Sequence, residues 1–151
     1  RCPVRRHCAA YATGTVDRFP ETTARPKATR RRFIAFVIRR GNTVLVRQRP
    51  AGVVNAHLWE FPNAEVTPDD PEAVTAAAHA LGVAATGGSP LAVIRHSITR
   101  YRMTLEGHPA ARRGRPTSTL GQWQPLERLR DLAFTAAHGR LAKHVDGRGP
   151  A

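Results

Sequence analysis

The chain has 151 residues, of which 41% are hydrophobic, and Lys+Arg 24 against Asp+Glu 11 give it a formal net charge of +13. This length fits one domain with a core and excludes two of ordinary size. No apolar run is long enough to cross a bilayer, and no signal-peptide pattern opens the sequence. The charge favours a polyanionic partner, nucleic acid above all, although abundant Arg, Ala, Gly and Pro are also typical of a GC-rich genome.

The first 32 residues lack the apolar periodicity of a packed domain. RCPVRRHCAAYATG (1–14) predicts a helix end or compact turn that stops at Gly14, and TVDRFPETTARPKATRRR (15–32) is typical of an extended linker. Both cysteines, Cys2 and Cys8, lie in the first segment, which argues against a disulfide framework spread through a fold. Taken alone, the pair fits two free thiols. Because the chain opens with Arg1 rather than Met, we expect a fragment or a processed product.

From residue 33 the composition is that of a folded domain. FIAFVIRRGNTVLVRQRP (33–50) predicts two strands around a turn at Gly41 and Asn42. A helix is expected between Pro68 and Gly82, with Asp69 or Asp70 as its cap and Gly82 as its end. One face of this helix is apolar, and it consists of Val74, Ala77, Ala78 and Leu81.

The second half of the domain alternates strands and helices. Strands are expected at 91–96 and 101–108, joined around Ser97–Thr99, and a basic loop follows at 109–118. Residues 121–132 predict a short strand and a helical turn, and 134–145 a closing helix with Thr135 as its cap. This order of elements predicts an α+β sandwich.

The stretch from Trp59 to Val83 has the frame of a known motif. WEFP before the loop and Leu-Gly-Val after the helix resemble the ends of the Nudix hydrolase box, whose glutamates hold divalent metal ions against a diphosphate. The box positions R-E-U-x-E-E are occupied here by Thr75, Ala76, Ala77, Ala78, His79 and Ala80. Every metal-binding glutamate of the box is therefore missing, and we expect this stretch to be scaffold. The acidic residues around it are interpreted as loop solvation and helix capping, and His79 as a surface or packing residue; they are Glu60, Glu65, Asp69, Asp70 and Glu72.

Three features together resemble the MutY-type adenine DNA glycosylases, A/G-specific. Cys2 and Cys8 are similar to the last two ligands of that family's C-x6-C-x2-C-x5-C cluster loop, and FPETTARPKATRRR resembles the linker after it. A Nudix-like domain without the box glutamates, ending in LAFTAAHGRL, resembles the C-terminal domain of the same family. The resemblance covers nearly the whole chain. It implies an α+β fold, a Nudix-like mixed-sheet α/β/α sandwich preceded by the tail of an iron–sulfur cluster loop and a linker.

The resemblance also implies a division of the chain and a role for it. Residues 1–14 would end the [4Fe-4S] loop, 15–32 would link, 33–145 would recognise 8-oxoguanine, and 146–151 would be a disordered tail. The parent enzyme would remove adenine mispaired with 8-oxoguanine or guanine in double-stranded DNA, by extruding the base. No residue of this chain would be catalytic, because the family's catalytic groups lie in an N-terminal helical domain. Two cysteines supply half of a [4Fe-4S] ligand set, so the cluster is expected in the intact protein and not in this fragment. A monomer in the bacterial cytoplasm at the nucleoid is implied.

The family's recognition loop, H-x-F-S-H and a following residue, matches six positions here. They are His96, Ser97, Ile98, Thr99, Arg100 and Tyr101. Thr99 stands where the family's base-contacting Ser lies, Ile98 replaces Phe as an apolar wedge, and Arg100 replaces His and suits phosphate or base stacking. An ordinary solvated β-turn is the other interpretation of this stretch.

Further basic and aromatic residues receive simpler roles. Trp59, Phe61 and Trp123 are expected in the core or at its edge. Candidate phosphate contacts are Arg30, Arg31, Arg32, Arg112, Arg113 and Arg115.

Two other functions fit the sequence. One is a nucleotide pyrophosphatase of the Nudix family, which the missing glutamates disfavour. The other is a protein-interaction module in which the linker docks a partner.

Overall fold

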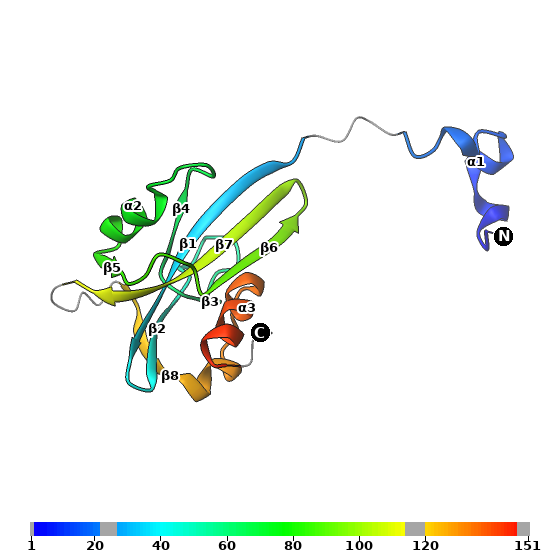
Figure 1. Ribbon diagram of the computed structural model, residues 1–151. Helices are drawn as coiled ribbons and strands as arrows, with labels where there is room; N and C mark the ends of the chain where they lie inside the picture. The colour runs from blue at the N-terminus through cyan, green and yellow to red at the C-terminus, as the bar shows by residue number, and fades with distance from the viewer. Residues whose placement is uncertain (1, 22–26, 114–119, 148–151) are drawn as a thin grey trace.

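The computed structural model describes residues 2–21, 27–113 and 120–147. Residues 2–21 form short turns of helix: η1 (Arg5–His7), α1 (Ala9–Ala12) and η2 (Val16–Arg18). Cys8 is the N-cap of α1, and the chain leaves this helix at Gly14, whose φ of +65° a glycine adopts without strain. The predicted compact turn ending at Gly14 is confirmed. Figure 1 shows this segment apart from the sheet.

The sheet is built on the first predicted hairpin. Strand β1 (Thr29–Arg40) turns through Gly41 and Asn42 into β2 (Thr43–Gln48), and Arg40 faces Thr43 across the turn. β1 starts four positions before residue 33, so residues 29–32, which their composition assigned to the linker, are strand. They pair with β7 (Tyr101–Arg112) and, at Arg32, with β4 (Asn63–Val66), and this pairing overrides the weak strand propensity of an arginine run.

The strands of the described residues form one mixed sheet. Its path is β3-β2-β1-β7-β5; β4 also pairs with β1, β6 with β7, and β8 with β2. β1 and β7 are parallel, and the other named pairs are antiparallel. The two strands predicted around Ser97–Thr99 are present as β6 (Ala92–Ile98) and β7, while β8 (Gln122–Pro125) leads into the helical turn η4 (Leu126–Asp131). β7 extends through residues 109–112, which were predicted as loop, because they pair with β5 and β1. Three strands were not predicted: β3 (Trp59–Glu60), β4 and β5 (Val83–Ala85).

Two helices cover the opposite faces of this sheet (Figure 1). On one face α2 (Ala73–Ala80) packs Ala77 and Ala78 against Ile34 and Phe36 of β1. The carboxylate of Asp70 accepts a hydrogen bond from the Glu72 N–H just before this helix. The chain leaves α2 at Gly82, with a φ of +63°. The predicted helix and its end are confirmed, but its N-cap is Glu72 rather than Asp69 or Asp70.

On the other face α3 (Ala136–Val145) packs Leu141, Ala142 and Val145 against Ala35 and Val37 of β1. Thr135 is its N-cap by position, as predicted, but the threonine hydroxyl makes no capping hydrogen bond. The fold is therefore a mixed α+β structure with a large sheet between helices, as the sequence predicts. No helix of the described residues is long and apolar enough to cross a membrane.

The predicted aromatic core residues are confirmed. Phe61 is fully buried and stacks on Phe134, with ring centroids 5.6 Å apart. Trp59 packs at the edge of the α3-side core, and Trp123 at the edge of the α2-side core.

Candidate nucleic-acid interface

Helix α2 carries the six box positions, and its surface is apolar or neutral. Ala77 and Ala78 are buried against the sheet, whereas Ala76, His79 and Ala80, which stand where the box has glutamates, are exposed. Methyl groups donate no electron pair to a metal, and one imidazole is a weak site for a hard cation that prefers several oxygens. Among the described residues no group of three or more His, Cys, Asp or Glu is placed to hold a metal ion. The divalent metal site of the hydrolase box does not fit this helix.

The carboxylates around α2 are used as ion-pair partners, which corrects the interpretation of Glu60. Instead of being solvated, Glu60 is only 3% exposed and accepts hydrogen bonds from Arg47 Nε (2.9 Å) and Arg49 Nη1 (2.6 Å). Burial favours the protonated form of this carboxyl, but the two guanidiniums outweigh it and hold the pKa of Glu60 below its ordinary value. Glu65 likewise pairs with Arg31. Both carboxylates thus tie strands together.

Next to Glu60 lies a buried histidine that the sequence did not single out. The Phe61 N–H donates to His138 Nδ1 at 3.1 Å, which fixes the imidazole as an acceptor at that nitrogen. Burial lowers the pKa of His138 to about 4. This histidine is therefore neutral at neutral pH, and it anchors α3 to the segment that follows β3.

The predicted recognition loop is the tip of the β6–β7 hairpin. Ile98 and Tyr101 are opposed, and Thr99 and Arg100 form the two-residue turn between them. Thr99 has a φ of +50°, which is rare for a β-branched residue, and its hydroxyl donates to the Ile98 carbonyl at 2.8 Å. The Arg100 carbonyl accepts the Thr29 N–H at 2.8 Å, so the tip is fastened to the start of β1.

The six predicted residues divide between the faces of the sheet. His96 and Ile98 alternate with Ser97 along β6, and register puts them opposite Met103 and Tyr101 on the α3 side. Ser97 lies on the α2 side, while Thr99 and Arg100 occupy the apex. One flat ligand therefore does not reach all six side chains from a single face. The apex is the part of this set that is free on both sides.

Two residues next to the apex, Tyr101 and His96, are partly buried. Tyr101 has the Arg100 guanidinium 5.3 Å and the Arg31 guanidinium 5.5 Å from its ring centroid, and its hydroxyl lies 3.2 Å from Arg100 Nη2. His96 is half-buried, and its Nδ1 has no hydrogen-bond partner among the described residues. Burial, with the neighbouring Arg140 charge, lowers the pKa of His96 below its ordinary value. Ile98 at the apex is 48% exposed.

Three of the predicted phosphate contacts are already neutralised within the fold. Arg30 lies 3.3 Å from Asp69, Arg31 pairs with Glu65, and Arg32 pairs with Glu106 through two nitrogens at 2.7 and 2.9 Å. The Arg32 pair is mostly buried, at 20% and 15% side-chain exposure. It serves first to hold β1, β7 and the loop before α2 together. Arg113 is exposed and Arg112 half-buried at the end of the sheet, and Arg115 lies outside the described residues.

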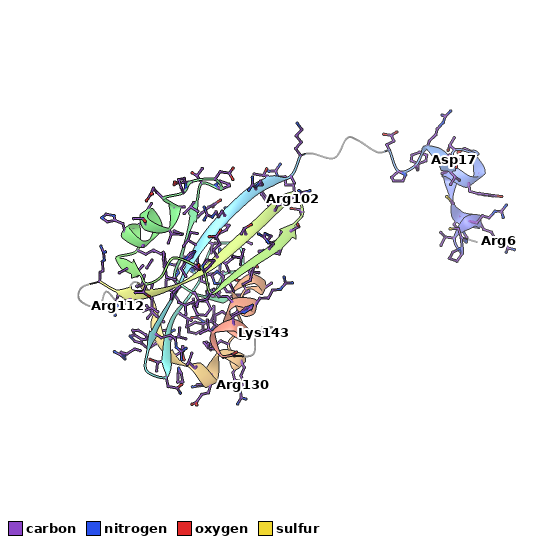
Figure 2. All side chains as sticks on the ribbon, viewed as in Figure 1. Arg6, Asp17, Arg102, Arg112, Arg130 and Lys143 are labelled. Carbon is purple, nitrogen blue, oxygen red and sulfur yellow. The ribbon has the colours of Figure 1, made fainter. Side chains whose placement is uncertain are left out.

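A cleft of about 680 Å³ opens on the α2 side of the sheet beside the hairpin tip. Its floor includes Ser97, Arg102, Arg95 and Thr104, because Ser97 faces Arg102 and Arg95 faces Thr104 across β6 and β7. Arg102 is labelled at the hairpin end of the domain in Figure 2. Arg95 and Arg102 were not predicted as site residues. The alternation of Arg95 with His96 and Ser97, and of Arg102 with Met103 and Thr104, was the signal that pointed to this shared face.

The two cysteines, near the N-terminus, are free thiols. Cys2 is exposed and Cys8 is half-buried, on either side of η1. Two thiolates suit two of the four positions of a [4Fe-4S] cluster, and the described residues contain no further cysteine.

Comparison with known proteins places the domain in a family. The model of the NUDIX domain matches residues 34–144. Among solved structures, the E. coli ORF135 protein is similar at 23% identity, with a TM-score of 0.64 over 80% of this chain and 91% of that chain. The MutT Nudix hydrolase of methicillin-resistant Staphylococcus aureus 252 is similar at 16% identity, with a TM-score of 0.62 over 81% and 99%.

A third similar structure is part of a larger protein, solved with a partner. It is the C-terminal domain of mouse MUTYH, solved in complex with human PCNA, with 21% identity and a TM-score of 0.54 over 78% of this chain and 88% of that chain. Identities at this level show a common fold. The match over residues 34–144, together with the sheet between α2 and α3, establishes that this chain belongs to the NUDIX domain family.

Proposed function

We propose that this NUDIX domain reads the 8-oxoguanine strand for an adenine DNA glycosylase that acts on A·8-oxoguanine and A·G mispairs. The observation that carries the proposal is the exposed hairpin apex, where Thr99 and Arg100 stand between the two faces of the sheet. The alanines at the metal positions of α2 and the similarity to the mouse MUTYH C-terminal domain support it. Within the family resemblance, adenine cleavage belongs to a separate helical domain.

The apex offers chemistry suited to an oxidised guanine in a duplex. The Thr99 hydroxyl donates to a neighbouring carbonyl that faces solvent, and it is free to exchange this bond for one to a base edge. Ile98 presents apolar surface next to it for contact with a base, and the Arg100 guanidinium suits a phosphate or a stacked base. Ser97 adds a hydroxyl on the cleft side. These groups recognise a base and its strand without a hydrolytic step.

Cys2 and Cys8 would hold two corners of a [4Fe-4S] cluster in the intact enzyme. Such a cluster, when bound, gives a structural cross-link between the four thiolates that hold it. The role of residues 2–21 in this proposal is to join the recognition domain to the glycosylase domain. No chemistry at the hairpin depends on that cluster.

The proposal is tested by measuring lesion discrimination at the apex. Thr99→Ala in the 151-residue chain is expected to lower the ratio of affinities for A·8-oxoguanine and A·G duplexes by about three- to tenfold, the worth of one hydrogen bond. Thr99→Ser keeps the hydroxyl and is expected to retain most of the ratio. Fluorescence anisotropy with the two labelled duplexes measures it. Equal losses on both duplexes for Thr99→Ala would remove the Thr99 hydroxyl, and with it the apex, from lesion recognition.

The alternative is hydrolysis of a free nucleotide, which the family match and the MutT-type structures favour. Incubation with 8-oxo-dGTP or ADP-ribose and Mg²⁺ discriminates between the two functions. The alanines at the metal positions of α2 predict no turnover above buffer. Turnover that rises with Mg²⁺ and vanishes with EDTA would establish the hydrolase instead.

A further inference from the structure

The cleft on the α2 side of the sheet contains arginines of two kinds. Arg30 and Arg32 have carboxylate partners, Asp69 and Glu106. Arg95 and Arg102 are exposed, and within the described residues no carboxylate lies within 4.0 Å of either. Their charges are therefore available to an anion that enters the cleft.

The positions of these two arginines follow from the strand register. Arg95 faces Thr104 on β7, and Arg102 lies two residues before Thr104 on the same strand, so the two are diagonal neighbours about 7–8 Å apart at this face. Ser97 faces Arg102, so a hydroxyl accompanies each guanidinium. Arg30 lies beside Arg102 across the parallel pair. Arg100 lies outside this row, because its guanidinium contacts the Tyr101 ring and hydroxyl on the α3 side of the sheet.

The wall of the cleft is held by the buried Arg32–Glu106 pair. Arg32 Nη1 also donates to the backbone carbonyl of Asp70 at 3.0 Å, which fixes the loop before α2 against the sheet. Hydrogen bonds from Arg32 hold the pKa of Glu106 below its ordinary value, so this carboxylate stays ionised and paired. The cleft is thus formed before any ligand arrives, which lowers the cost of binding.

We propose that this cleft binds the phosphodiester backbone of a DNA strand, with Arg95 and Arg102 as its phosphate contacts. The inference rests on the proposed function, because the cleft would contact the phosphates of the same strand whose base contacts the apex. Two guanidiniums about 7–8 Å apart along one sheet face, with no carboxylate of the described residues on either, match two charges of a regularly spaced line. A DNA strand presents one phosphate per about 3.4 Å of helix axis, whereas a free nucleotide presents all its charge at one end.

Phosphate contacts and base contacts leave different signatures, and this separates the cleft from the apex. A guanidinium on a phosphate adds affinity for every sequence and releases a counterion, whereas a contact to the lesion changes the preference between duplexes. Arg95→Gln and Arg102→Gln are therefore expected to weaken binding to A·8-oxoguanine, A·G and undamaged duplexes alike, by about fivefold each. The ratio between duplexes should stay unchanged.

The experiment is a salt titration of the full chain by fluorescence anisotropy, between about 50 and 200 mM NaCl. Each of the two substitutions is expected to reduce the slope of log K against log salt by about 1, and the double variant by about 2. Arg130→Gln is the matched control, since it removes the same charge at the opposite end of the domain (Figure 2). Arg102→Lys keeps a charge and is expected to keep the slope. Thermal unfolding confirms that the exposed substitutions leave the fold intact.

Three results distinguish a failure of the cleft proposal from a failure of the apex proposal. A slope that changes no more for Arg95→Gln and Arg102→Gln than for Arg130→Gln overturns the cleft. Displacement of the duplex by 8-oxo-dGMP at an affinity that depends on Arg102 overturns the strand assignment in favour of a nucleotide site. A reduced slope in a protein without preference for 8-oxoguanine supports the cleft and contradicts the proposed role of the apex.

Discussion

At the scale of single residues, Thr99 combines an unfavourable backbone conformation with an exposed position at the hairpin tip. A φ of +50° costs a β-branched residue on the order of 1 kcal/mol or more, and the hydrogen bond to its neighbour's carbonyl is solvent-exposed and offsets little of it. Glycine or asparagine would fit this turn with less strain. A threonine at such a position fits a role for its hydroxyl outside the fold.

Thr99→Gly is expected to raise the free energy of unfolding by about 1 kcal/mol, because relief of the positive-φ strain exceeds the added entropy of the unfolded chain. Thr99→Ala keeps a Cβ and is expected to bring no such gain. Urea unfolding of the two variants beside the wild type measures the difference. Equal stabilities for Gly and Ala would show that the turn holds threonine without strain.

His138 makes stability depend on pH in a defined window. Its pKa is about 4 in the folded state and about 6.5 in the unfolded chain, so the unfolded state binds the extra proton between these values. Stability is therefore full above pH about 6.5 and falls by about 3 kcal/mol as the pH drops to about 4. Urea unfolding at a series of pH values follows this loss. In His138→Gln the slope between pH 6.5 and 5 should fall to the part that the lowered pKa of His96 contributes. A slope equal to that of the wild type would show that His138 does not cause it.

At the scale of elements, a buried charge cluster joins β2 to β3. Glu60 on β3 bonds Arg47 on β2 and Arg49 just beyond its end, and both guanidiniums are less than a third exposed. Removing the carboxylate leaves two partly buried cations without their partner. Glu60→Gln is expected to cost on the order of 3 kcal/mol of unfolding free energy. Arg47→Gln leaves Arg49 on the carboxylate and should cost less. A Glu60→Gln loss below that of Arg47→Gln would contradict the assignment.

The elements with local signals could be predicted from the sequence. Gly41 and Gly82 mark the hairpin turn and the end of α2, and the alternation on each side of Thr99 marks β6 and β7. β4 could not be predicted, because Asn63–Val66 contains no run of residues with high strand propensity. It becomes a strand through pairing with β1. Likewise, Arg31 and Arg32 could be recognised as basic, but their partners Glu65 and Glu106 lie 34 and 74 positions away. No local pattern reveals such pairs. Strand alternation could therefore place Arg95 and Arg102 on one face, but only the fold shows which arginines of that face have carboxylate partners.

At the scale of the whole molecule, the arginines behind the net charge of +13 include some that are paired with carboxylates and some that are not. Many arginines hold the sheet and loops together through Glu60, Glu65 and Glu106, and these contribute to the fold. The arginines left without carboxylates near the hairpin gather where the apex meets the cleft. Under the two proposals, strands β6 and β7 carry both functions at one end, a tip that reads the base and a face that binds the strand. Helix α2, which carries metal ligands in Nudix hydrolases, serves here as packing.

The most direct test of this account is the affinity of the wild-type chain for two duplexes that differ only at O8 of one guanine, opposite adenine. Measured by anisotropy at the same salt concentration, the affinity for the A·8-oxoguanine duplex is expected to exceed that for the A·G duplex by roughly tenfold, as one or two additional hydrogen bonds at the apex would give. Equal affinities for the two duplexes would contradict the central claim that this domain reads 8-oxoguanine.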